Sequence, residues 1–278
     1  MTGHAAPVSV AWGAATDVGR RRTLNEDAYL AAPPLFLVAD GMGGHQAGEI
    51  ASATVVDEFA RLTGRASLTI HDVQTALRIA RSRVDALPAG GGAGAGTTLA
   101  GVAVVDVDGD GYWLTVNLGD SRTYRLSDGE LEQVSVDHSV VQELIDAGEL
   151  DAASAARDAR RNVITRAIGA GSDSEADFWL LPAEEGDRIL VCSDGLPTEV
   201  DDIRIRAVLA EERHPQAAAE RLVAEAVAAG GRDNVTAVVV DALAVRTRGG
   251  RDRSDTVPTA AAFDEIDGDT LPRARARA

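Results

Sequence analysis

Two stretches of the chain share one pattern, a short apolar run that ends in Asp-Gly. Residues 35–39 are all apolar and lead directly into Asp40. Residues 188–192 lead, by way of a serine, into Asp194. A short apolar run that ends at a turn predicts a buried strand. Each carboxylate is therefore expected at the end of a rigid element, where a ligand can reach it.

The remaining hydrophobic pattern predicts covering helices and antiparallel hairpins. Apolar residues recur at helical spacing in 47–62 and 73–87, and Asp72 is expected to cap the second helix. Asp-Gly turns between apolar runs predict β-hairpins. Further strands are predicted at 8–14, 99–107, 112–118, 123–134 (a hairpin), 177–181, 187–192 and 235–243, and further helices at 202–210 and 215–228.

Antiparallel hairpins followed by covering helices favour an α+β layered fold over a Rossmann fold. Residues 1–245 are expected to form one folded domain, from which residues 137–170 project as a mobile surface insertion. Residues 246–278 mix arginines and acids with prolines and few large apolar residues. Such a segment cannot bury a core, so we expect a disordered C-terminal tail.

Composition excludes several functions. The net charge of −17 disfavours a nucleic-acid role, because nucleic-acid binding needs a basic surface. The chain contains no lysine. A phosphate-binding loop of the Walker type, a protein kinase and a Schiff-base enzyme each require one.

The chain is expected to be cytoplasmic and monomeric. The single cysteine, Cys192, allows no intramolecular disulfide and lies inside an apolar run, which favours a packing role. No apolar stretch approaches the ~20 residues of a membrane span. The N-terminus lacks the basic and then apolar pattern of a signal peptide.

Carboxylates are the candidate chemistry. Like charges raise one another's pKa and repel, so a cluster of acids needs cations. Oxygen ligands select Mg²⁺ or Mn²⁺ over zinc, and no His/Cys cluster competes. The candidate cluster comprises Glu26, Asp27, Asp40, Asp120, Asp194 and Asp233.

Six segments in order resemble the metal-dependent serine/threonine protein phosphatases of the protein phosphatase 2C (PPM) family, in its bacterial branch. Together they span roughly residues 8–244. The resemblance implies two packed antiparallel β-sheets flanked by helices, an αββα sandwich, with residues 137–170 as the variable flap. The segments are Asp17-x-Gly-x-x-Arg-x-x-Asn-Glu-Asp27, Val38-Ala-Asp-Gly-Met-Gly-Gly-His45, Gly96-Thr-Thr98, Gly119-Asp-Ser-Arg122, Cys192-Ser-Asp-Gly195 and Arg232-Asp-Asn-Val-Thr236.

The resemblance also implies roles for individual residues. Two ions, Mn²⁺ or Mg²⁺, would be bridged by Asp40, and the Gly41 carbonyl would bind one of them. Asp120 and Asp194 would hold a third ion in addition. The other implied roles are Asp194 and Asp233 on the first ion, Glu26 on the second, Asp27 and Asn234 as supports behind the ligands, and Arg22 as the phosphate-binding arginine.

Two positions depart from the family pattern. Eukaryotic members carry a histidine directly after Asp-Gly, where this chain has Met42. His45 is the nearby alternative for a general acid, and a structural hydrogen bond is the other interpretation of this residue. Pro197-Thr198 also replaces residues that are usually small or acidic, and no metal ligand is lost there.

The expected function is a phosphoprotein phosphatase that acts on phosphoserine and phosphothreonine and opposes eukaryotic-like Ser/Thr kinases. In the expected mechanism, hydroxide activated by two metal ions attacks the phosphate directly. A catalytically weak phosphoprotein-binding scaffold is the alternative, and a two-metal nuclease conflicts with the charge. The tail carries Ser254, Thr256, Thr259 and Thr270. Once phosphorylated, it could bind a phosphothreonine-reading domain, or it could be an inert extension.

Overall fold

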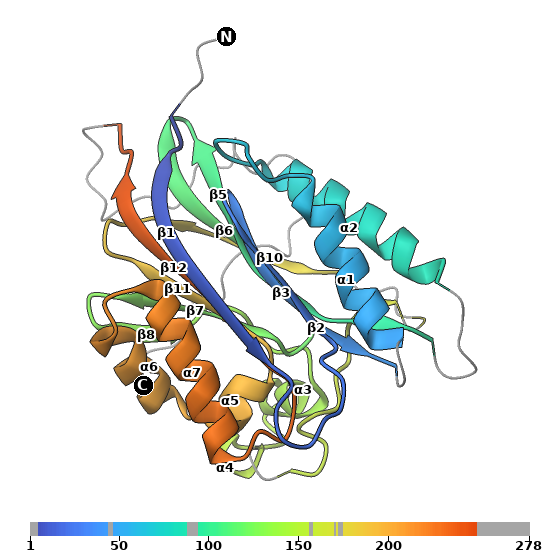
Figure 1. Ribbon diagram of the computed structural model, residues 1–278. Helices are drawn as coiled ribbons and strands as arrows, with labels where there is room; N and C mark the ends of the chain where they lie inside the picture. Colours follow the sequence, from blue (N-terminus) through green and yellow to red (C-terminus); the bar gives the residue numbers. More distant parts are fainter. Residues whose placement is uncertain are drawn as a thin grey trace.

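Two antiparallel sheets lie face to face, and helices cover the outer face of each (Figure 1). The computed structural model describes residues 5–43, 47–87, 94–155, 158–169, 171 and 175–248. Every strand pairing within these residues is antiparallel. This confirms the predicted α+β sandwich of four layers.

The first sheet has five strands and brings the two ends of the domain together. The strand nearest the N-terminus pairs with the strand nearest the C-terminus over their whole length, from Val8 opposite Val245 to Asp17 opposite Val235. In spatial order the strands are β1 (Val8–Asp17), β12 (Val235–Val245), β11 (Arg188–Cys192), β7 (Arg122–Ser127) and β8 (Glu130–Gln133).

The second sheet has seven strands, and its central strand β3 is buried along most of its length. In spatial order its strands are β10 (Asp177–Pro182), β6 (Asp110–Leu118), β5 (Leu99–Val107), β3 (Leu35–Met42), β4 (Gly96–Thr97) and β9 (Ile168–Gly169), with β2 (Asp27–Ala32) also paired to β3.

Five helices complete the outer layers. The pair α1 (Ala47–Ala60) and α2 (Ile70–Asp85) covers the seven-stranded sheet (Figure 1). The five-stranded sheet is covered by α5 (Gly195–Glu199), α6 (Asp202–Glu211) and α7 (Pro215–Ala229). Alternation along each strand sends one set of side chains to the helices and the other to the facing sheet.

Three apolar clusters fill the spaces between the four layers. Phe59 of α1 lies in the cluster under the first helix pair, and Leu222 of α7 lies in the cluster on the opposite side. The third cluster lies between the sheets and includes Phe36 and Trp113. On β3, Leu35 and Leu37 belong to the first cluster while Phe36 belongs to the third, as the period of two requires.

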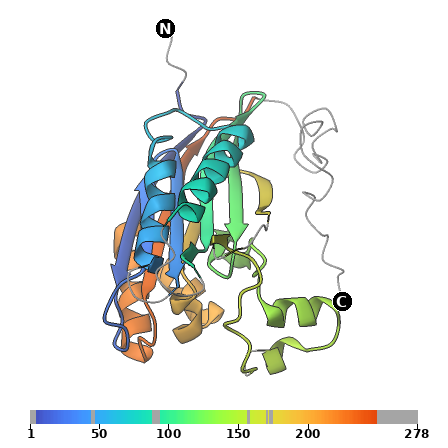
Figure 2. The same cartoon turned by 90° about the vertical axis from the view of Figure 1, so that its right-hand side faces the viewer.

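The insertion at residues 137–170 contains α3 (Val140–Asp146) and the short α4 (Ala152–Ala155), and it ends at β9. Figure 2 shows both helices projecting below the sandwich, beside the ends of the strands. The return segment is tied to the outgoing one, because Val140 N–H donates to Val163 O at 2.9 Å. The name flap is kept for residues 137–170 below.

Several local predictions need correction. The strand through Asp40 does not end there, because Gly41 and Met42 continue it and pair with β4. Asp72 is not the N-cap of α2: Thr69 is the N-cap, and Asp72 completes a capping box by accepting the Thr69 backbone N–H. The hydrophobic pattern did not predict β2, α5 or the short elements β4, β9 and α4.

The predicted boundary at residue 245 lies close to a set of contacts. Arg246 donates its backbone N–H to Pro7 O at 2.8 Å and its Nε to Gly109 O at 2.8 Å. Arg248 donates to Asp108 O at 3.0 Å. The start of the predicted tail is therefore bound at the β5–β6 turn, while residues 249–278 lie outside the described residues.

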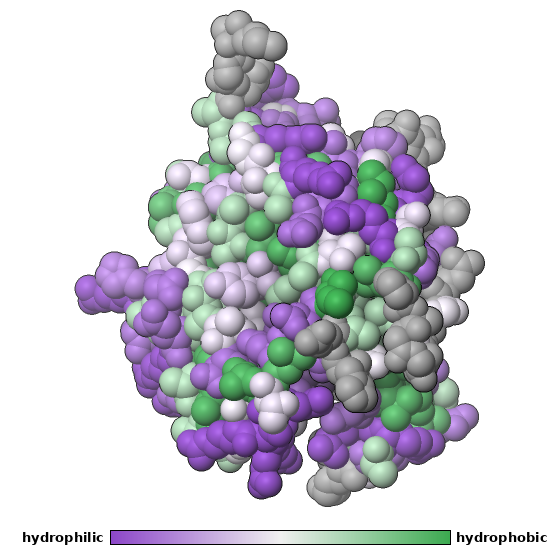
Figure 3. All heavy atoms as spheres, turned by 45° about the vertical axis from the view of Figure 1, so that its right-hand side comes forward, coloured by the Kyte–Doolittle hydropathy of each residue, from purple (hydrophilic) through white to green (hydrophobic). Residues whose placement is uncertain are grey.

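On the face shown in Figure 3, apolar side chains are scattered among polar ones. This distribution matches helices whose apolar positions point inward, such as Val73, Leu77 and Val84 of α2. Of the described helices, none combines the length and the apolar character that crossing a membrane requires.

Candidate active site

Five carboxylates from distant parts of the sequence line one open cleft. The cleft has a volume of about 260 Å³ and lies where strands of both sheets end. Gathering this much negative charge around one space is costly unless a cation enters it. The lining residues are Arg22, Glu26, Asp40, Gly41, Met42, Gly43, Thr98, Asp120, Asn162, Ile164, Asp194 and Asp233.

Strand ends place these carboxylates. Asp40 is the third residue from the end of β3, and Asp120 occupies the turn that follows β6. Asp194 follows β11 and directly precedes α5, while Asp233 lies two residues before β12. Glu26 directly precedes β2. The side chains are therefore carried by the ends of five different strands.

The backbone at Asp40 is held by the Thr97-Thr98 pair. Asp40 N–H donates to Thr98 Oγ1 at 3.0 Å, and Thr98 N–H donates to Asp40 O at 2.9 Å. Thr97 Oγ1 donates to Asp40 O at 2.9 Å as well. The next residue must be glycine, because a Cβ on Gly41 would lie 2.2 Å from Gly48 O. This packing fixes where Asp40 and the Gly41 carbonyl lie.

Asp27 lies behind the cleft rather than in its lining. Its Oδ2 accepts hydrogen bonds from Thr236 Oγ1 at 2.6 Å and from Ser193 Oγ at 2.8 Å. These contacts tie β2 to the neighbours of Asp194 and Asp233, and the supporting role of Asp27 stays a prediction. Only the tertiary fold reveals Ser193 and Thr236 as its partners.

Asn234 joins three segments of the site. Its side-chain oxygen accepts the Glu26 N–H at 2.9 Å, and its Nδ2 donates to Val18 O and Leu24 O at 3.0 and 2.9 Å. The Asn234 side chain is buried. Asn234 therefore holds the loop that carries Arg22 and Glu26 in place beside the start of β12.

Arg22 is the cation of the cleft lining. Its Nη2 donates to Asp233 Oδ2 at 2.8 Å, and 49% of its side chain stays exposed. The hydrogen bond from this guanidinium to Asp233 raises the pKa of Arg22 above its usual value. A half-exposed guanidinium anchored on one side can present its remaining donors to an anion in the cleft.

Burial and mutual repulsion raise the pKa of the clustered acids. Burial followed by the charge of Asp194 raises the pKa of Asp120 to about 8. Burial followed by Asp233 raises the pKa of Asp194 to about 6. Burial raises the pKa of Asp40 well above its usual value, with Asp27 the next cause. The fold thus holds these carboxylates in surroundings that destabilise their ionised forms.

The donor set fits hard divalent cations. All the candidate ligands are oxygens, and Glu26 Oε1 and Asp27 Oδ1 are buried without a hydrogen-bond partner in the described residues. Across the parts of the chain that the structure describes, no three acidic, histidine or cysteine side chains converge on a single point. The carboxylates therefore surround the cleft without forming a closed coordination set.

The structure brings most predicted site residues together. Arg22, Glu26, Asp40, Gly41, Asp120, Asp194 and Asp233 all line the cleft. His45 lies outside the described residues, so its role stays a prediction. Two flap residues also line the cleft and were not predicted from the sequence, Asn162 and Ile164. Their segment was interpreted only as insertion, because no local pattern indicates which flap residues face the cleft.

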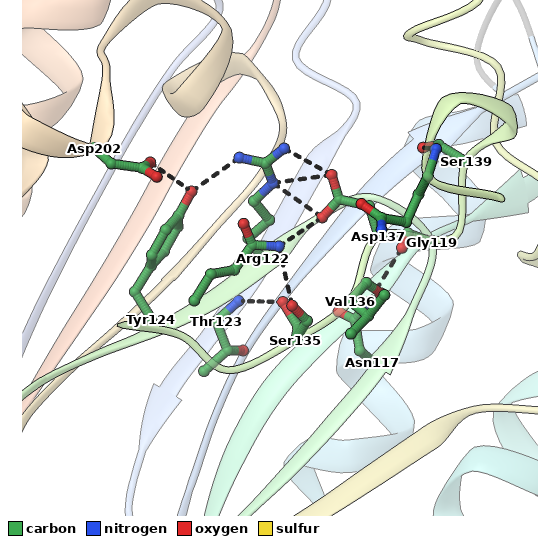
Figure 4. A network of polar contacts seen from close by, with 12 residues as sticks. Asn117, Gly119, Arg122, Thr123, Tyr124, Ser135, Val136, Asp137, Ser139 and Asp202 are labelled. Carbon is green, nitrogen blue, oxygen red and sulfur yellow. Dashed lines mark hydrogen bonds and ion pairs between the residues drawn. The ribbon is translucent and has the colours of Figure 1, made fainter. Parts of the chain in front are cut away.

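A polar network supports the loop that carries Asp120 (Figure 4). Arg122 donates to both carboxylate oxygens of Asp137, with Nη2 at 2.7 Å from Oδ2, and to Tyr124 Oη at 3.0 Å. Asn117 Nδ2 donates to Gly119 O at 3.1 Å. The loop is therefore bound to the base of the flap.

The family model and similar known proteins indicate the same protein family. The family model described as protein phosphatase 2C matches residues 18–243. The serine/threonine phosphatase stp of Listeria monocytogenes is 35% identical over 260 residues, which cover 86% of this chain and 98% of that protein. The serine/threonine protein phosphatase PstP of Mycobacterium tuberculosis is 37% identical over 243 residues, which cover 84% of this chain and 45% of PstP.

Solved structures show the same fold. The structure of PstP/Ppp from Mycobacterium tuberculosis superposes with a TM-score of 0.77 at 36% identity, covering 84% of this chain and 98% of that one. The PstP catalytic domain in complex with two manganese ions gives 0.74 at 36% identity, covering 84% and 99%. MsPP from Mycobacterium smegmatis in complex with cacodylate gives 0.75 at 39% identity, covering 86% and 100%.

Proposed function

This chain belongs to the protein phosphatase 2C family and is a bacterial serine/threonine protein phosphatase, and from that premise we propose how its cleft works. The enzyme hydrolyses phosphoserine and phosphothreonine in proteins with the help of Mn²⁺ or Mg²⁺, and it opposes eukaryotic-like Ser/Thr kinases. The observation that carries the proposal is the single cleft in which five carboxylates and Arg22 meet.

The proposed ligands are those that line the cleft. Asp40, the Gly41 carbonyl, Asp194, Asp233 and Glu26 would hold two ions. Asp120 and Asp194 would hold a third ion. When bound, divalent ions supply Lewis-acid chemistry, which lowers the pKa of water and neutralises charge on phosphate oxygens. The chain itself contributes the negative charge that attracts these ions and the fixed backbone that spaces them.

Arg22 is the proposed phosphate ligand. Its fixed fork can donate two parallel hydrogen bonds to two oxygens of a phosphate, which a lysine cannot do. The bond to Asp233 at 2.8 Å orients the guanidinium, and its exposed half faces solvent in the cleft. The residue therefore positions the phosphate beside the carboxylates.

The donor of the leaving-group proton is a separate question. Met42 lines the cleft but has no ionisable group, so it cannot protonate a serine or threonine oxygen. His45, three residues further along, is the proposed acid. Asp27 and Asn234 hold no substrate atom in this scheme: they support Glu26, Asp194 and Asp233 through hydrogen bonds.

The proposal for the cellular setting comes from the sequence. The enzyme would act in the cytoplasm as a monomer. A phosphorylated tail would bind a phosphothreonine-reading domain, with Ser254, Thr256, Thr259 and Thr270 as the candidate sites. The scaffold alternative is not favoured, because every proposed metal ligand is retained and lines the cleft.

Hydrolysis of a phosphothreonine peptide with Mn²⁺, with and without chelator, tests the proposed chemistry. We expect turnover with Mn²⁺ or Mg²⁺ and its loss in excess chelator. Phosphate release should show no burst from a phosphorylated enzyme, because water attacks directly. Full activity in excess chelator would reject the proposed metal dependence, while family membership would stand.

A further inference from the structure

Two neighbouring flap residues hold the loop around Asp120 from both sides. Asp137 binds Arg122, two residues after Asp120, through both of its carboxylate oxygens (Figure 4). His138 binds Gly119, the residue directly before Asp120. Asp120 therefore stands between two anchored points, and both anchors belong to the base of the flap.

The contact between His138 and Gly119 is reciprocal. Gly119 N–H donates to His138 Nδ1 at 3.1 Å, and His138 N–H donates to Gly119 O at 2.9 Å. Because Nδ1 accepts a hydrogen bond, the ring proton must sit on Nε2. Nε2 then donates to Asp177 Oδ2 at 3.1 Å. The His138 side chain is 5% exposed, so its bond to Gly119 is buried, whereas 42% of the Asp177 side chain is exposed and the bond to Asp177 lies nearer to solvent.

The same histidine is bound to the returning arm of the flap. Thr165 N–H donates to His138 O at 2.8 Å. Arg166 Nη1 donates to Asp177 Oδ1 at 3.3 Å, so it shares the carboxylate that His138 binds. The preceding residues of this arm, Asn162 and Ile164, line the cleft. His138 thus contacts the Asp120 loop through its ring and the returning arm through its backbone oxygen, while Asp177 of β10 links the ring to Arg166.

The Asp120 loop needs such an anchor because its backbone is unusual. Gly119 has φ +112°, a region that other residues rarely adopt. A Cβ there would lie 2.6 Å from Thr98 Cγ2, so the loop also packs tightly against the threonine that holds Asp40. A small rotation at Gly119 would move the Asp120 carboxylate relative to Asp40 and Asp194.

We propose that His138 is a positioning residue. Through its Nδ1 it holds the Gly119 turn so that Asp120 faces the cleft, and through Nε2, Asp177 and Arg166 it positions the returning arm of the flap, which carries Asn162 and Ile164. This role depends on the proposed ligand role of Asp120. Groups that orient metal ligands from behind typically contribute 10–100-fold in metal affinity or activity. His138 would contribute on that scale without touching ion or substrate.

Two substitutions separate the two hydrogen bonds. The Oδ1 of asparagine is bonded to Cγ, as Nδ1 of histidine is, so His138→Asn keeps an acceptor for Gly119 and loses the donor to Asp177. The amide of glutamine extends one atom further, as Nε2 does, so His138→Gln keeps the donor to Asp177 and loses the acceptor for Gly119. His71→Asn is the matched control, since His71 is exposed on α2.

The first readout is hydrogen exchange of the Gly119 amide, followed by NMR on metal-free protein. We expect His138→Gln to speed this exchange about tenfold, which corresponds to about 1.4 kcal/mol, and His138→Asn to change it by less than about threefold. The second readout is Mn²⁺ binding, followed by electron paramagnetic resonance of the free ion. The weakest site should lose affinity on the order of tenfold in His138→Gln and stay near wild type in His138→Asn.

A role in packing alone makes the opposite prediction. If both variants weaken Mn²⁺ binding equally, or if His138→Gln behaves as wild type, the positioning role is rejected. Asp120→Asn serves as the reference. If it leaves Mn²⁺ binding unchanged, the proposed ligand role of Asp120 is wrong and the role of His138 falls with it. If Asp120→Asn weakens binding and His138→Gln does not, only the role of His138 is wrong.

Discussion

Two aspartates flank the same strand and have opposite surroundings. Asp187 directly precedes β11, and Asp194 follows it by two residues. The two residues have the same side chain and lie next to the same buried strand. Asp187 belongs to the end of the sandwich opposite the cleft, and Asp194 belongs to the cleft.

Asp187 is 1% exposed, and the protein satisfies it fully. Its Oδ1 accepts from Arg125 Nη2 at 2.8 Å, and its Oδ2 accepts from Trp113 Nε1 at 3.0 Å and from Glu184 N–H at 2.9 Å. The guanidinium and the two further donors replace the hydrogen bonds to water that this carboxylate loses on burial. This end of the sheet needs nothing from solution.

Asp194 has acidic neighbours instead. Burial followed by Asp233 raises its pKa to about 6, and Asp40, whose own pKa is raised by burial and by Asp27 and Asp194, is a further acidic neighbour. Arg22 binds Asp233 on the open side of the cleft, where half of its side chain is exposed. Burial alone therefore does not distinguish a site aspartate from a structural one. The distinguishing feature is that Asp194 lies beside acidic side chains, whereas Asp187 accepts hydrogen bonds from a guanidinium.

Asp194→Asn should have the largest effect and separates activity from stability. Loss of a metal ligand removes several kcal/mol of transition-state stabilisation, so turnover of a phosphothreonine peptide should fall about 10³-fold or more. The melting temperature in chelator should stay equal or rise, because repulsion with Asp233 is relieved. Asp128→Asn, in an exposed hairpin turn, is the matched control. A variant that keeps a tenth of the wild-type rate would contradict the ligand role.

Asp187→Asn should give the reverse result. Removing the charge leaves the partly buried Arg125 with only the more distant carboxylate of Glu184, at 3.7 Å, so the free energy of unfolding should fall by about 3 kcal/mol. The value of kcat per folded molecule should stay near wild type, because the residue lies away from the cleft. Urea unfolding followed by circular dichroism measures the first quantity. A loss below about 1 kcal/mol would show that the Asp187 contacts are not the stabilising ones.

Arg22→Ala should act on substrate binding more than on turnover. Loss of a bidentate phosphate contact is expected to raise KM about tenfold, with kcat falling less than in the metal-ligand variants. Arg22→Lys should restore only part of the loss, since a point charge cannot donate two parallel bonds. The adjacent exposed arginine provides the control, Arg21→Ala. An unchanged KM in Arg22→Ala would assign the residue to structure.

Truncations at the Asp187 end should have the smallest effects. Deleting residues 249–278 should leave the melting temperature unchanged. Deleting residues 246–278 should lower stability by about 1 kcal/mol, because Arg246 loses its hydrogen bonds to Pro7, Gly109 and Ala5. Thermal unfolding of the two truncated proteins side by side tests this boundary. Peptide turnover should be the same in both, since residues 246–248, by which the two deletions differ, are not part of the cleft lining.

The sequence by itself determined the elements whose signal is local. An apolar run followed by Asp-Gly located β3 and β11 together with Asp40 and Asp194, because a strand and its turn are specified by neighbouring residues. The other acidic residues of the cleft were identified through the resemblance of six ordered motifs to a known family. Local patterns even predicted most strand and helix bounds to within a few residues.

Only the tertiary structure decided which acids lack a cation. Asp187 and Asp194 stand at the two ends of one apolar run, and the glycine that follows Asp194 predicts a turn but does not indicate which charges either carboxylate meets in space. The difference arises because β7 brings Arg125 to Asp187, whereas β12 and β3 bring Asp233 and Asp40 to Asp194. Tertiary packing also determines that His138 contacts Gly119 and that Asn162 lines the cleft. Charge balance and hydrogen bonding depend on which distant segments lie side by side.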